Sequence, residues 1–381
     1  MTARPMRVAI LGAGPAGLYF AYRLKRARPD VVIEIFEQNS QGATFGFGVA
    51  FSGRALEFLR EQDAETHAAL APALQSWTDS IIDLNGTEIR IDGMTYTGIG
   101  RLALLAILEA QARSVGIVPR YSQRMASLDE LDADLIVGAD GANSLVRQTH
   151  HEGFGPSITP LTNRYAWFGT TRRFEALCHT FIETSEGCFN AHHHPHAPDM
   201  STFVVEVDAR TFHRCGFDTM DADSVRIKCE QIFARILGGH PLISNHSVWR
   251  RFAKIWNERW SVGNRVLLGD ALHTAHFSIG SGTRLALEDA IALAAALDAH
   301  PSDIPTALAA FETARKPEVA KLTAAANSSA EWYEHFAEHM RLDPLDFAMS
   351  YITRSGRVDL ARLRATSPKF LAAYEARRPP A

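Results

Sequence analysis

The chain has 381 residues, about twice the length of an average domain, so two lobes or one large core are expected. Its 39 Lys and Arg against 43 Asp and Glu leave a net charge of −4, which argues against nucleic acid as a partner. With 46% hydrophobic residues, the composition is typical of a globular protein. The sequence contains no uncharged apolar stretch of about 20 residues, so no membrane span is predicted. The four cysteines have neither CxxC spacing nor the density of a disulfide scaffold, which favours a cytoplasmic protein.

The amino end predicts a strand, a tight glycine turn and a helix. Residues 7–11 form a short apolar run, and a helical pattern begins at residue 18. The turn between them consists of Gly12, Ala13, Gly14, Pro15, Ala16 and Gly17. In a dinucleotide-binding unit Gly12 makes the turn, Gly14 lets the backbone approach a pyrophosphate, and Gly17 lets the helix pack on its strand. The helix N-terminus then faces the phosphates.

An acidic residue completes this unit. The second apolar strand, residues 31–36, ends at Glu37, which lies 20 residues beyond Gly17. A carboxylate at this place accepts hydrogen bonds from ribose hydroxyls, and it favours the free 2′-hydroxyl of FAD or NAD over NADP. A glycine-rich turn that binds nothing is the alternative. The complete order of strand, glycines, helix, strand and acid argues against that alternative.

Two further buried strands, at 134–138 and 266–269, run into turns that contain Asp140 and Asp270. A glycine turn before a long predicted helix follows the second of them, with Gly280, Gly282 and Thr283. Together with the first glycine turn, the Asp140 turn and the Asp270 turn make three motifs. Their order and separation resemble those of the single-component FAD-dependent aromatic monooxygenases built like p-hydroxybenzoate hydroxylase, in which the second is the DG motif and the third is the GD motif. The resemblance spans nearly the whole chain. It implies an α/β fold, with a Rossmann-like FAD-binding domain, an inserted antiparallel-sheet substrate domain and a helical C-terminal region.

The resemblance also implies roles for residues around the flavin. In the family, the GD aspartate accepts a hydrogen bond from the ribityl chain, and Asp270 matches it. Gly280, Gly282 and Thr283 match the turn that starts a helix beneath the pyrimidine end of the flavin. Backbone N–H groups at such a helix N-terminus stabilise the negative charge of reduced flavin.

The remaining cofactor contacts come from two other segments. Asp140 and Arg147 match the DG motif, which the family uses at the flavin–nicotinamide side and to brace the sheet. For Asp140, an Asp-Gly turn with structural work only is the alternative. Arg101 begins an apolar helix that resembles the family's arginine-headed, cofactor-contacting helix. Because the chain has only one glycine-rich phosphate fingerprint, NADH or NADPH is expected to bind transiently.

The motifs divide the chain into alternating FAD-binding and substrate-binding segments. FAD-binding parts are expected at 1–75, at 101–160 with the DG motif, and at 261–325 with the GD motif. The substrate domain is expected at 76–100 and 161–260, followed by a helical region at 326–381. Alternating runs at 165–170, 179–183, 188–192 and 201–207 predict that its sheet is antiparallel.

Local patterns in this half resemble one branch of the family. Residues 164–170, the triplet 190–192 and the turn 276–282 look like the branch with salicylyl-CoA 5-hydroxylase, anthraniloyl-CoA monooxygenase and the violacein-pathway hydroxylase. Most aromatic hydroxylases carry proline where this chain has His276 and Phe277. The carboxyl end, 351–357, resembles the salicylyl-CoA enzyme more than the violacein one.

Four clustered histidines, His192, His193, His194 and His196, suggest a metal site at first sight. Neighbours on a strand point to opposite faces, however, so three of them cannot converge on one ion, and no metal is expected. His192 and His276 are the candidate catalytic residues, because a histidine can take the proton of a phenolic substrate. A partly exposed loop position is the alternative for His192, and packing against the cofactor is the alternative for His276.

The resemblance implies a cytoplasmic monooxygenase of aromatic catabolism. FAD is reduced by NADH or NADPH, O₂ adds to the flavin, and the C4a-hydroperoxide transfers oxygen to an activated aromatic ring. The branch implies an aryl-CoA thioester substrate, with salicylyl-CoA converted to gentisyl-CoA. Whether the protein forms a homodimer stays open.

Charge complementarity gives a second line of inference about the substrate. CoA phosphates require cationic groups near the substrate cleft, and the chain offers Arg172–Arg173, Arg250–Arg251 and Arg354 with Arg357. Solvated surface positions are the alternative for each pair. Other functions also stay open, namely hydroxylation of another aromatic or indolic intermediate, a flavin dehydrogenase or oxidase, and a redox-sensing binding protein.

Overall fold

A five-stranded, mostly parallel sheet forms the first half of the molecule. The computed structural model describes residues 4–53 and 55–377. The strand order is β16-β17-β8-β1-β2, and only β16 runs antiparallel to its neighbour. The strands are β1 (Arg7–Leu11), β2 (Val32–Phe36), β8 (Leu135–Gly138), β16 (Ser261–Val262) and β17 (Arg265–Leu267). This sheet carries the three predicted glycine motifs at the carboxyl ends of β1, β8 and β17, where parallel sheets bind ligands.

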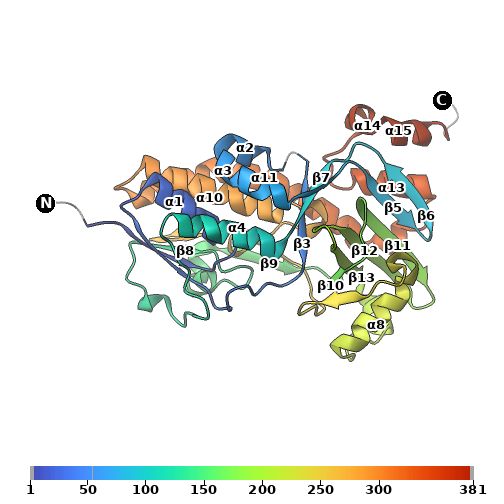
Figure 1. Cartoon of the computed structure of the whole chain (residues 1–381), viewed down its shortest axis with the longest axis horizontal. Coiled ribbons are helices and arrows are strands. Elements are labelled where there is room, and N and C mark those ends of the chain that lie inside the picture. Colours follow the sequence, from blue (N-terminus) through green and yellow to red (C-terminus); the bar gives the residue numbers. More distant parts are fainter. Residues whose placement is uncertain (1–3, 54, 378–381) are drawn as a thin grey trace.

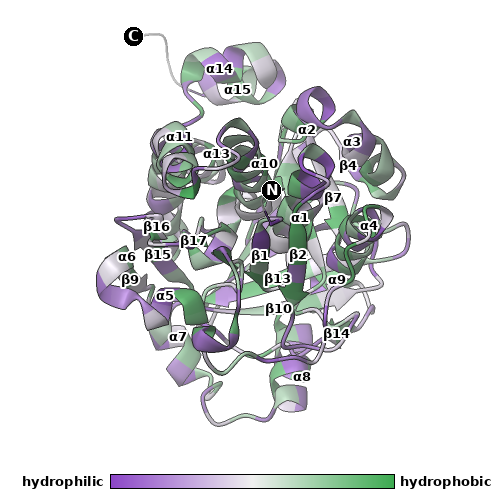
Figure 2. Ribbon diagram, turned by 90° about the vertical axis from the view of Figure 1, so that its left-hand side faces the viewer, coloured by the Kyte–Doolittle hydropathy of each residue, from purple (hydrophilic) through white to green (hydrophobic). Residues whose placement is uncertain are grey.

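Helices cover this sheet because their apolar faces need burial. In α1 (Pro15–Ala27), Leu18, Tyr19 and Phe20 are all buried, and Pro15 occupies the first turn, where a missing N–H costs nothing. This helix packs against α4 (Arg101–Ser114) and α10 (Gly282–Ala299). Figure 2 shows β1, β2 and β17 surrounded by helices, with α14 (Leu360–Thr366) and α15 (Pro368–Glu375) as an outer pair.

A seven-stranded sheet forms the second half, at the right of Figure 1. Its order is β14-β10-β13-β12-β11-β5-β6, and all neighbours are antiparallel except β5 and β11. The strands are β5 (Ser80–Leu84), β6 (Thr87–Ile91), β10 (Arg164–Thr170), β11 (Leu177–Thr184), β12 (Gly187–Pro195), β13 (Ser201–Val207) and β14 (Leu242–Ser244). The predicted antiparallel substrate sheet is therefore present, with one parallel pair that the sequence did not indicate.

Strand alternation separates the two faces of this sheet. On β13, Phe203 and Val205 pack into an apolar cluster with the helices beneath, while Val204 on the other face lines the cavity described below. On β12, His193 stacks on Phe203, with ring centroids 5.1 Å apart, whereas His192 lines the cavity. The period of two along the strands thus decides which histidines reach the cavity.

Shorter elements connect the halves. Two small sheets contain β3 (Gly48–Ser52), β7 (Tyr96–Gly100) and β4 (Gln75–Trp77), and β9 (Pro156–Pro160) with β15 (Ala253–Asn257). The remaining helices are α2 (Glu57–Gln62), α3 (Ala64–Leu70), α5 (Leu145–Thr149), α6 (His151–Phe154), α7 (Ala209–Arg214), α8 (Ala222–Ile232), α9 (Ala234–Leu237), α11 (Ile304–Glu334), α12 (Phe336–His339) and α13 (Pro344–Thr353). Among the described residues, no helix is long and apolar enough to cross a membrane.

The chain order of these elements can be set beside the expected segments. Residues 76–100 contain β5 and β6, which extend the substrate sheet, together with β7, which pairs with β3. The expected boundary after residue 325 falls inside α11, a continuous helix of 31 residues. Its apolar positions continue across that point, with Val319, Ala326 and Ala330 all buried, so no linker separates the two parts.

Candidate active site

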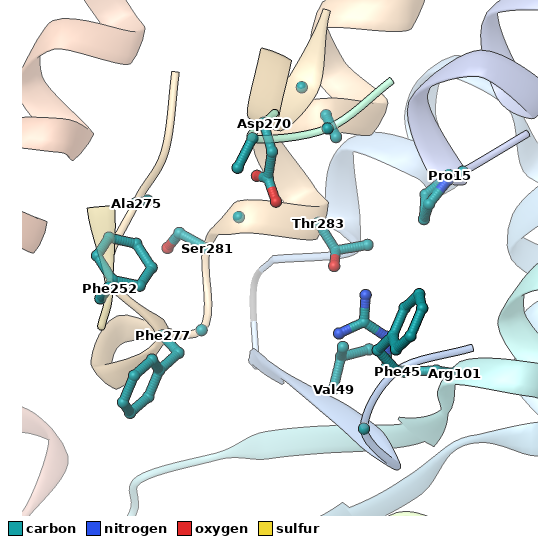
Figure 3. A pocket seen from close by; sticks show the side chains of 18 of the residues that line it. Pro15, Phe45, Val49, Arg101, Phe252, Asp270, Ala275, Phe277, Ser281 and Thr283 are labelled. Atoms are coloured by element: carbon teal, nitrogen blue, oxygen red, sulfur yellow. The ribbon is translucent and has the colours of Figure 1, made fainter. Parts of the chain in front are cut away.

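A cavity of about 1040 Å³ is lined by residues of both large sheets. All residues expected to bind the cofactor except Gly17 line it, namely Gly12, Gly14, Pro15, Ala16, Glu37, Arg101, Asp140, Asp270, Gly280, Gly282 and Thr283. Figure 3 shows Asp270, Thr283 and Arg101 around one part of this space and Phe252 and Phe277 on the side opposite Arg101. The folding of distant segments thus brings the three predicted motifs to one wall.

The first glycine turn is constrained in two different ways. Gly12 has φ +101°, and a Cβ there would lie 2.3 Å from the carbonyl oxygen of Ala139. A Cβ on Gly17 would lie 2.1 Å from the carbonyl oxygen of Gly12, so both residues are required by packing within the protein. At Gly14, by contrast, no atom lies within 4 Å of an added Cβ. The space in front of Gly14 at the start of α1 suits the close approach of a pyrophosphate.

Glu37 is held at the end of β2 by backbone and side-chain amides. Its Oε2 accepts a hydrogen bond of 2.9 Å from the backbone N–H of Ala13, and its Oε1 accepts two from Asn39. These bonds orient the carboxylate and leave acceptor capacity on Oε2 for ribose hydroxyls. The glycine turn and the acidic residue therefore form one connected unit.

Asp270 and Arg101 form an ionic part of the wall. The side chain of Asp270 is exposed to the cavity, yet protein surrounds it on most sides, and this enclosure raises the pKa of its carboxyl. Enclosure lowers the pKa of Arg101, which the charge of Asp270 partly offsets. Gly280 has φ +59°, and its added Cβ would lie 2.7 Å from the carbonyl oxygen of Ala50, so only glycine fits this turn before α10.

The residues of the DG motif, Asp140 and Arg147, form hydrogen bonds within the protein. Asp140 Oδ2 accepts a hydrogen bond of 2.6 Å from the backbone N–H of Leu145, while Oδ1 is buried without a protein partner. Arg147 is buried and donates to the carbonyl oxygens of Ala271, at 2.8 Å, and of Ala142. Arg147 therefore joins the second motif to the third, and Asp140 both closes its turn and faces the cavity.

Histidine and aromatic side chains line the part of the cavity beneath the substrate sheet. His179, His192 and His194 all line it, as does Tyr351 of α13. The His179 ring lies 4.9 Å from that of His192 and 4.7 Å from that of Tyr351, measured between centroids. Burial lowers the pKa of His192 to about 3, so this imidazole is neutral at physiological pH. His192 therefore lies on a buried strand and not in the partly exposed loop considered from the sequence.

Glu206 lies behind His192 on the neighbouring strand. It is 2% exposed; its Oε1 accepts a hydrogen bond of 2.9 Å from Asn163 Nδ2, and its Oε2 lies 3.6 Å from His192 Nε2 without a hydrogen bond. Burial raises the pKa of the Glu206 carboxyl. Because Nε2 of His192 faces Glu206, Nδ1 is the nitrogen left for a molecule in the cavity.

His276 has a different position from the one expected of a catalytic residue. It is buried and does not line the cavity; the neighbouring Phe277 does, and contacts both His276 and His192 at centroid distances of 4.2 and 5.4 Å. His276 Nδ1 lies 2.8 Å from Ser278 Oγ, which lies 2.7 Å from Ser329 Oγ of α11. The turn geometry thus directs the Phe277 ring, and not the imidazole of His276, toward the cavity.

These features have the chemistry that FAD requires. The open space at Gly14, the acceptor at Glu37 and the charged side chains of Asp270 and Arg101 are the groups expected to contact pyrophosphate, ribose and ribityl groups. Within residues 4–53 and 55–377, no group of three or more His, Cys, Asp or Glu side chains could hold a metal ion. His193 lies on the other face of β12 from His192 and contacts Thr180 at 3.0 Å.

Comparisons with known proteins decide the family. A family model described as FAD binding domain matches residues 5–326. A salicyloyl-CoA 5-hydroxylase from Streptomyces sp is 39% identical over 361 residues, which cover 92% of this chain and 70% of the relative. This chain belongs to the FAD-dependent aromatic monooxygenases. FAD is therefore its cofactor and NADH or NADPH its reductant, and the substrates of this monooxygenase are an aromatic compound and O₂.

Two other named monooxygenases are similar in sequence to this chain. A 3-hydroxy-4-methyl-anthranilyl-[aryl-carrier protein] 5-monooxygenase from Streptosporangium sibiricum is 36% identical and covers 86% of this chain and 89% of its own. Protodeoxyviolaceinate monooxygenase from Chromobacterium violaceum is 33% identical and covers 92% and 94%. The branch resemblance that the local motifs indicated is thus confirmed.

Solved structures share the fold of this monooxygenase. The tetrameric form of 2-methyl-3-hydroxypyridine-5-carboxylic acid oxygenase has a TM-score of 0.72 at 18% identity and covers 96% of each chain. Tetracycline destructase Tet(51) has a TM-score of 0.69 at 16% identity and covers 99% of this chain and all of its own. The predicted FAD-binding fold with a substrate domain and a helical C-terminal region is confirmed.

The sequence interpretation of this monooxygenase missed several residues of the cavity wall. Glu206 had a visible signal, because it is the one charged residue of the otherwise uncharged run 201–207. His179 and Tyr351 had no such signal, since each is one of many similar residues along the chain, and only pairing of β11 with β12 and packing of α13 bring them to His192.

Of the expected arginine pairs, Arg354 and Arg357 both line the cavity, whereas Arg172 and Arg173 do not. Arg251 donates to the carbonyl oxygen of Leu161 away from the cavity, whereas Arg250 lies on the wall above Phe45. Arg354 lines the cavity, but its three guanidinium nitrogens donate to Ser329, to Tyr351 and to Ser278, at 2.9, 2.7 and 2.8 Å. These three hydrogen bonds hold the Arg354 side chain against α11, α13 and the turn before α10, and a role of Arg354 toward phosphates stays a prediction.

Proposed function

We propose that this monooxygenase hydroxylates an aryl-CoA thioester, with salicylyl-CoA as substrate and gentisyl-CoA as product. The observation that carries the proposal is the continuity of the cavity, which runs from the cofactor motifs past His192 and Tyr351 to residues 354–362 at the carboxyl end. Because the cavity lining continues from the cofactor motifs to residues of the carboxyl-terminal region, it suits an aromatic acid joined to an extended acyl carrier. The Streptomyces relative, named for salicyloyl-CoA, supports the same substrate class.

The overall reaction balances with one reductant and one oxygen molecule. Salicylyl-CoA, O₂, NAD(P)H and a proton give gentisyl-CoA, NAD(P)⁺ and water, with the new hydroxyl para to the existing one. Bound FAD supplies the chemistry that takes a hydride from the nicotinamide and activates O₂. The chain positions the ring, excludes water and receives a proton.

We infer that His192 receives the proton of the phenolic hydroxyl. It is neutral at physiological pH, because burial holds its pKa near 3, and its Nδ1 is available to the substrate. Its Nε2 lies 3.6 Å from Glu206, so a positive charge formed on the ring would be stabilised by the carboxyl group behind it. A low pKa makes His192 a weak base, and its contribution to the rate is therefore moderate.

The test compares carriers with the same aromatic ring. Purified enzyme is incubated with salicylate, salicylyl-pantetheine or salicylyl-CoA, and NADH consumption and product mass under ¹⁸O₂ are followed. We expect efficient formation of a labelled hydroxylated thioester and poor turnover of salicylate. If salicylate or a bare indole had a higher kcat/KM than every thioester, the proposed substrate class would be wrong.

A second candidate is an indolic or other natural-product intermediate. The 33% identity with protodeoxyviolaceinate monooxygenase over 92% of this chain supports it. A dehydrogenase, an oxidase or a redox-sensing protein would bind FAD in the same cradle but would incorporate no oxygen. The labelled-oxygen experiment separates these alternatives from hydroxylation.

We also infer a cytoplasmic location, because Cys178, Cys188, Cys215 and Cys229 are all free thiols. Burial raises the pKa of the Cys229 thiol, which keeps it protonated and unreactive. Light scattering of the purified holoenzyme would establish whether it forms a homodimer.

A further inference from the structure

Two arginines from the carboxyl-terminal region of the chain have no side-chain partner among the described residues. Arg357 and Arg362 both line the cavity and are exposed. Within residues 4–53 and 55–377, neither forms an ion pair or a side-chain hydrogen bond. This distinguishes them from Arg354, whose guanidinium donates three hydrogen bonds to protein acceptors.

The surroundings increase the positive charge at this end. Partial enclosure by the protein lowers the pKa of Arg357, and the positive charges of Arg284 of α10 and of Arg362 lower it further. Arg284 is neutralised by Glu288, at 2.8 Å, but no carboxylate neutralises the other two within the described residues. Two like charges held near one another without a counter-ion cost free energy, which a bound anion would recover.

The two arginines and the cofactor motifs lie on different segments of the cavity lining. The groups expected to hold the FAD pyrophosphate, Gly14 and the start of α1, belong to the β1 unit. Arg357 and Arg362 instead follow α13, whose Tyr351 packs on His179 in the chamber with His192. Tyr96 of β7 lines the same cavity; burial raises the pKa of its phenol, and the charges of Arg354, Arg357 and Arg362 partly offset that rise.

We propose that Arg357 and Arg362 form a phosphate-binding subsite for the nucleotide end of a CoA thioester whose aromatic ring lies beside His192. The subsite rests on the proposed function, since it assigns the two arginines to the carrier of that substrate. Their guanidinium groups bind phosphate oxygens through charge-assisted, bidentate hydrogen bonds. The subsite would distinguish CoA from the same thioester without a nucleotide.

The test combines two charge-neutral substitutions with a matched control. The variant Arg357→Gln/Arg362→Gln removes both charges. The control, Arg364→Gln, removes a charge from α14, the helix that also carries Arg362; Arg364 pairs with Glu375 at 3.1 Å and does not line the cavity. Calorimetric titration of the FAD-loaded enzymes with CoA and with pantetheine measures binding without turnover. Steady-state kinetics then compare salicylyl-CoA with salicylyl-pantetheine.

For the wild type, we expect KM for the CoA ester to be at least about tenfold lower than KM for the pantetheine ester. The KM for the CoA ester should rise with salt concentration, because salt screens the attraction between the arginines and the phosphates. The double variant should lose this difference through a higher KM for the CoA ester, while Arg364→Gln should behave as the wild type. Dephospho-CoA, which lacks the 3′-phosphate, shows which phosphate is bound.

Three outcomes would overturn the subsite. They are equal wild-type affinity for both esters, equal loss in the control variant, and an effect on KM for NADH in place of KM for the CoA ester. The last outcome would assign the arginines to the phosphates of the reductant. If both thioesters are hydroxylated equally well, only the subsite fails; if neither is hydroxylated, the proposed function fails as well.

Discussion

The cofactor cradle and the substrate chamber are built by different physical means. The cradle consists of backbone turns at the carboxyl ends of β1, β8 and β17, and glycines such as Gly12 and Gly280 have positive φ there. The chamber consists of side chains on one face of a largely antiparallel sheet, with His192 and Glu206 on adjacent strands. A backbone site depends on short, local sequence units, whereas a side-chain site depends on strand register and packing. The two regions should therefore respond differently to substitution.

The largest effect is expected from substitution of two of the three glycines of the first turn, Gly12 and Gly14. Gly12→Ala should destabilise the apoprotein by several kcal/mol, because φ is +101° and the new Cβ would meet the Ala139 carbonyl oxygen at 2.3 Å. Gly14→Ala should leave apoprotein stability unchanged and weaken FAD binding by about tenfold or more, since its Cβ would enter space needed by the ligand. Thermal unfolding of apoproteins and FAD titration measure both. Equal destabilisation of the two variants would contradict a ligand-imposed requirement at Gly14.

The second prediction concerns the two histidines. His192→Gln should lower kcat for hydroxylation by about ten- to a hundredfold, because it removes a proton acceptor on the cavity wall. His276→Gln should lower it only severalfold, since that ring lies outside the wall and acts through Ser278 and Phe277. Product formed per NADH consumed is measured with one substrate across pH. A larger loss in His276→Gln would reverse the assignment.

The third prediction tests the ionic part of the cradle. Asp270→Ala should raise the Kd for FAD by about tenfold or more, because a charge-assisted hydrogen bond to the ligand contributes about 1.5–3 kcal/mol. The control is Asp298→Ala, which changes an exposed acid at the far end of α10. Fluorescence titration of the apoproteins gives the affinities. Wild-type affinity in Asp270→Ala would show that the third motif is misassigned.

The smallest effect expected is the acid sensitivity of the chamber. Burial lowers the pKa of His194 to about 4, so the unfolded chain binds a proton near pH 6.5 before the folded protein does. Stability is therefore lost as pH falls from about 6.5 toward about 4, by roughly 1 kcal/mol for this residue at pH 5.5.

A matched pair of variants isolates this loss. His194→Phe keeps the ring that stacks on Trp77 and should flatten the fall in the free energy of unfolding between pH 7 and 5.5, whereas exposed His213→Phe should not. Urea unfolding at each pH measures the difference. Buried carboxyls such as Glu206 act with the opposite sign, since a raised pKa lowers stability as pH rises through it. An unchanged slope in His194→Phe would contradict the buried neutral histidine.

The cofactor half was predictable from the sequence to a large extent. The strand–turn–helix order, the spacing to Glu37 and the later Asp140 and Asp270 motifs are local patterns, and the structure places their expected cofactor-binding residues except Gly17 on one cavity wall. The family and its fold followed from the same motifs. Local patterns suffice here because a parallel sheet always presents its carboxyl-end loops at one edge.

The sequence by itself determined the FAD-binding fold, the cofactor and the branch of the family, because glycine turns and buried strands act over a few residues. Only the tertiary structure decided that His192 and not His276 reaches the cavity, that Glu206 lies behind it, and that Arg354 is occupied by protein acceptors. These outcomes depend on strand pairing, on the rotation of one turn and on contacts between segments as far as 76 residues apart in the chain. Side-chain direction across such distances is set by packing of the whole core, which no local pattern contains.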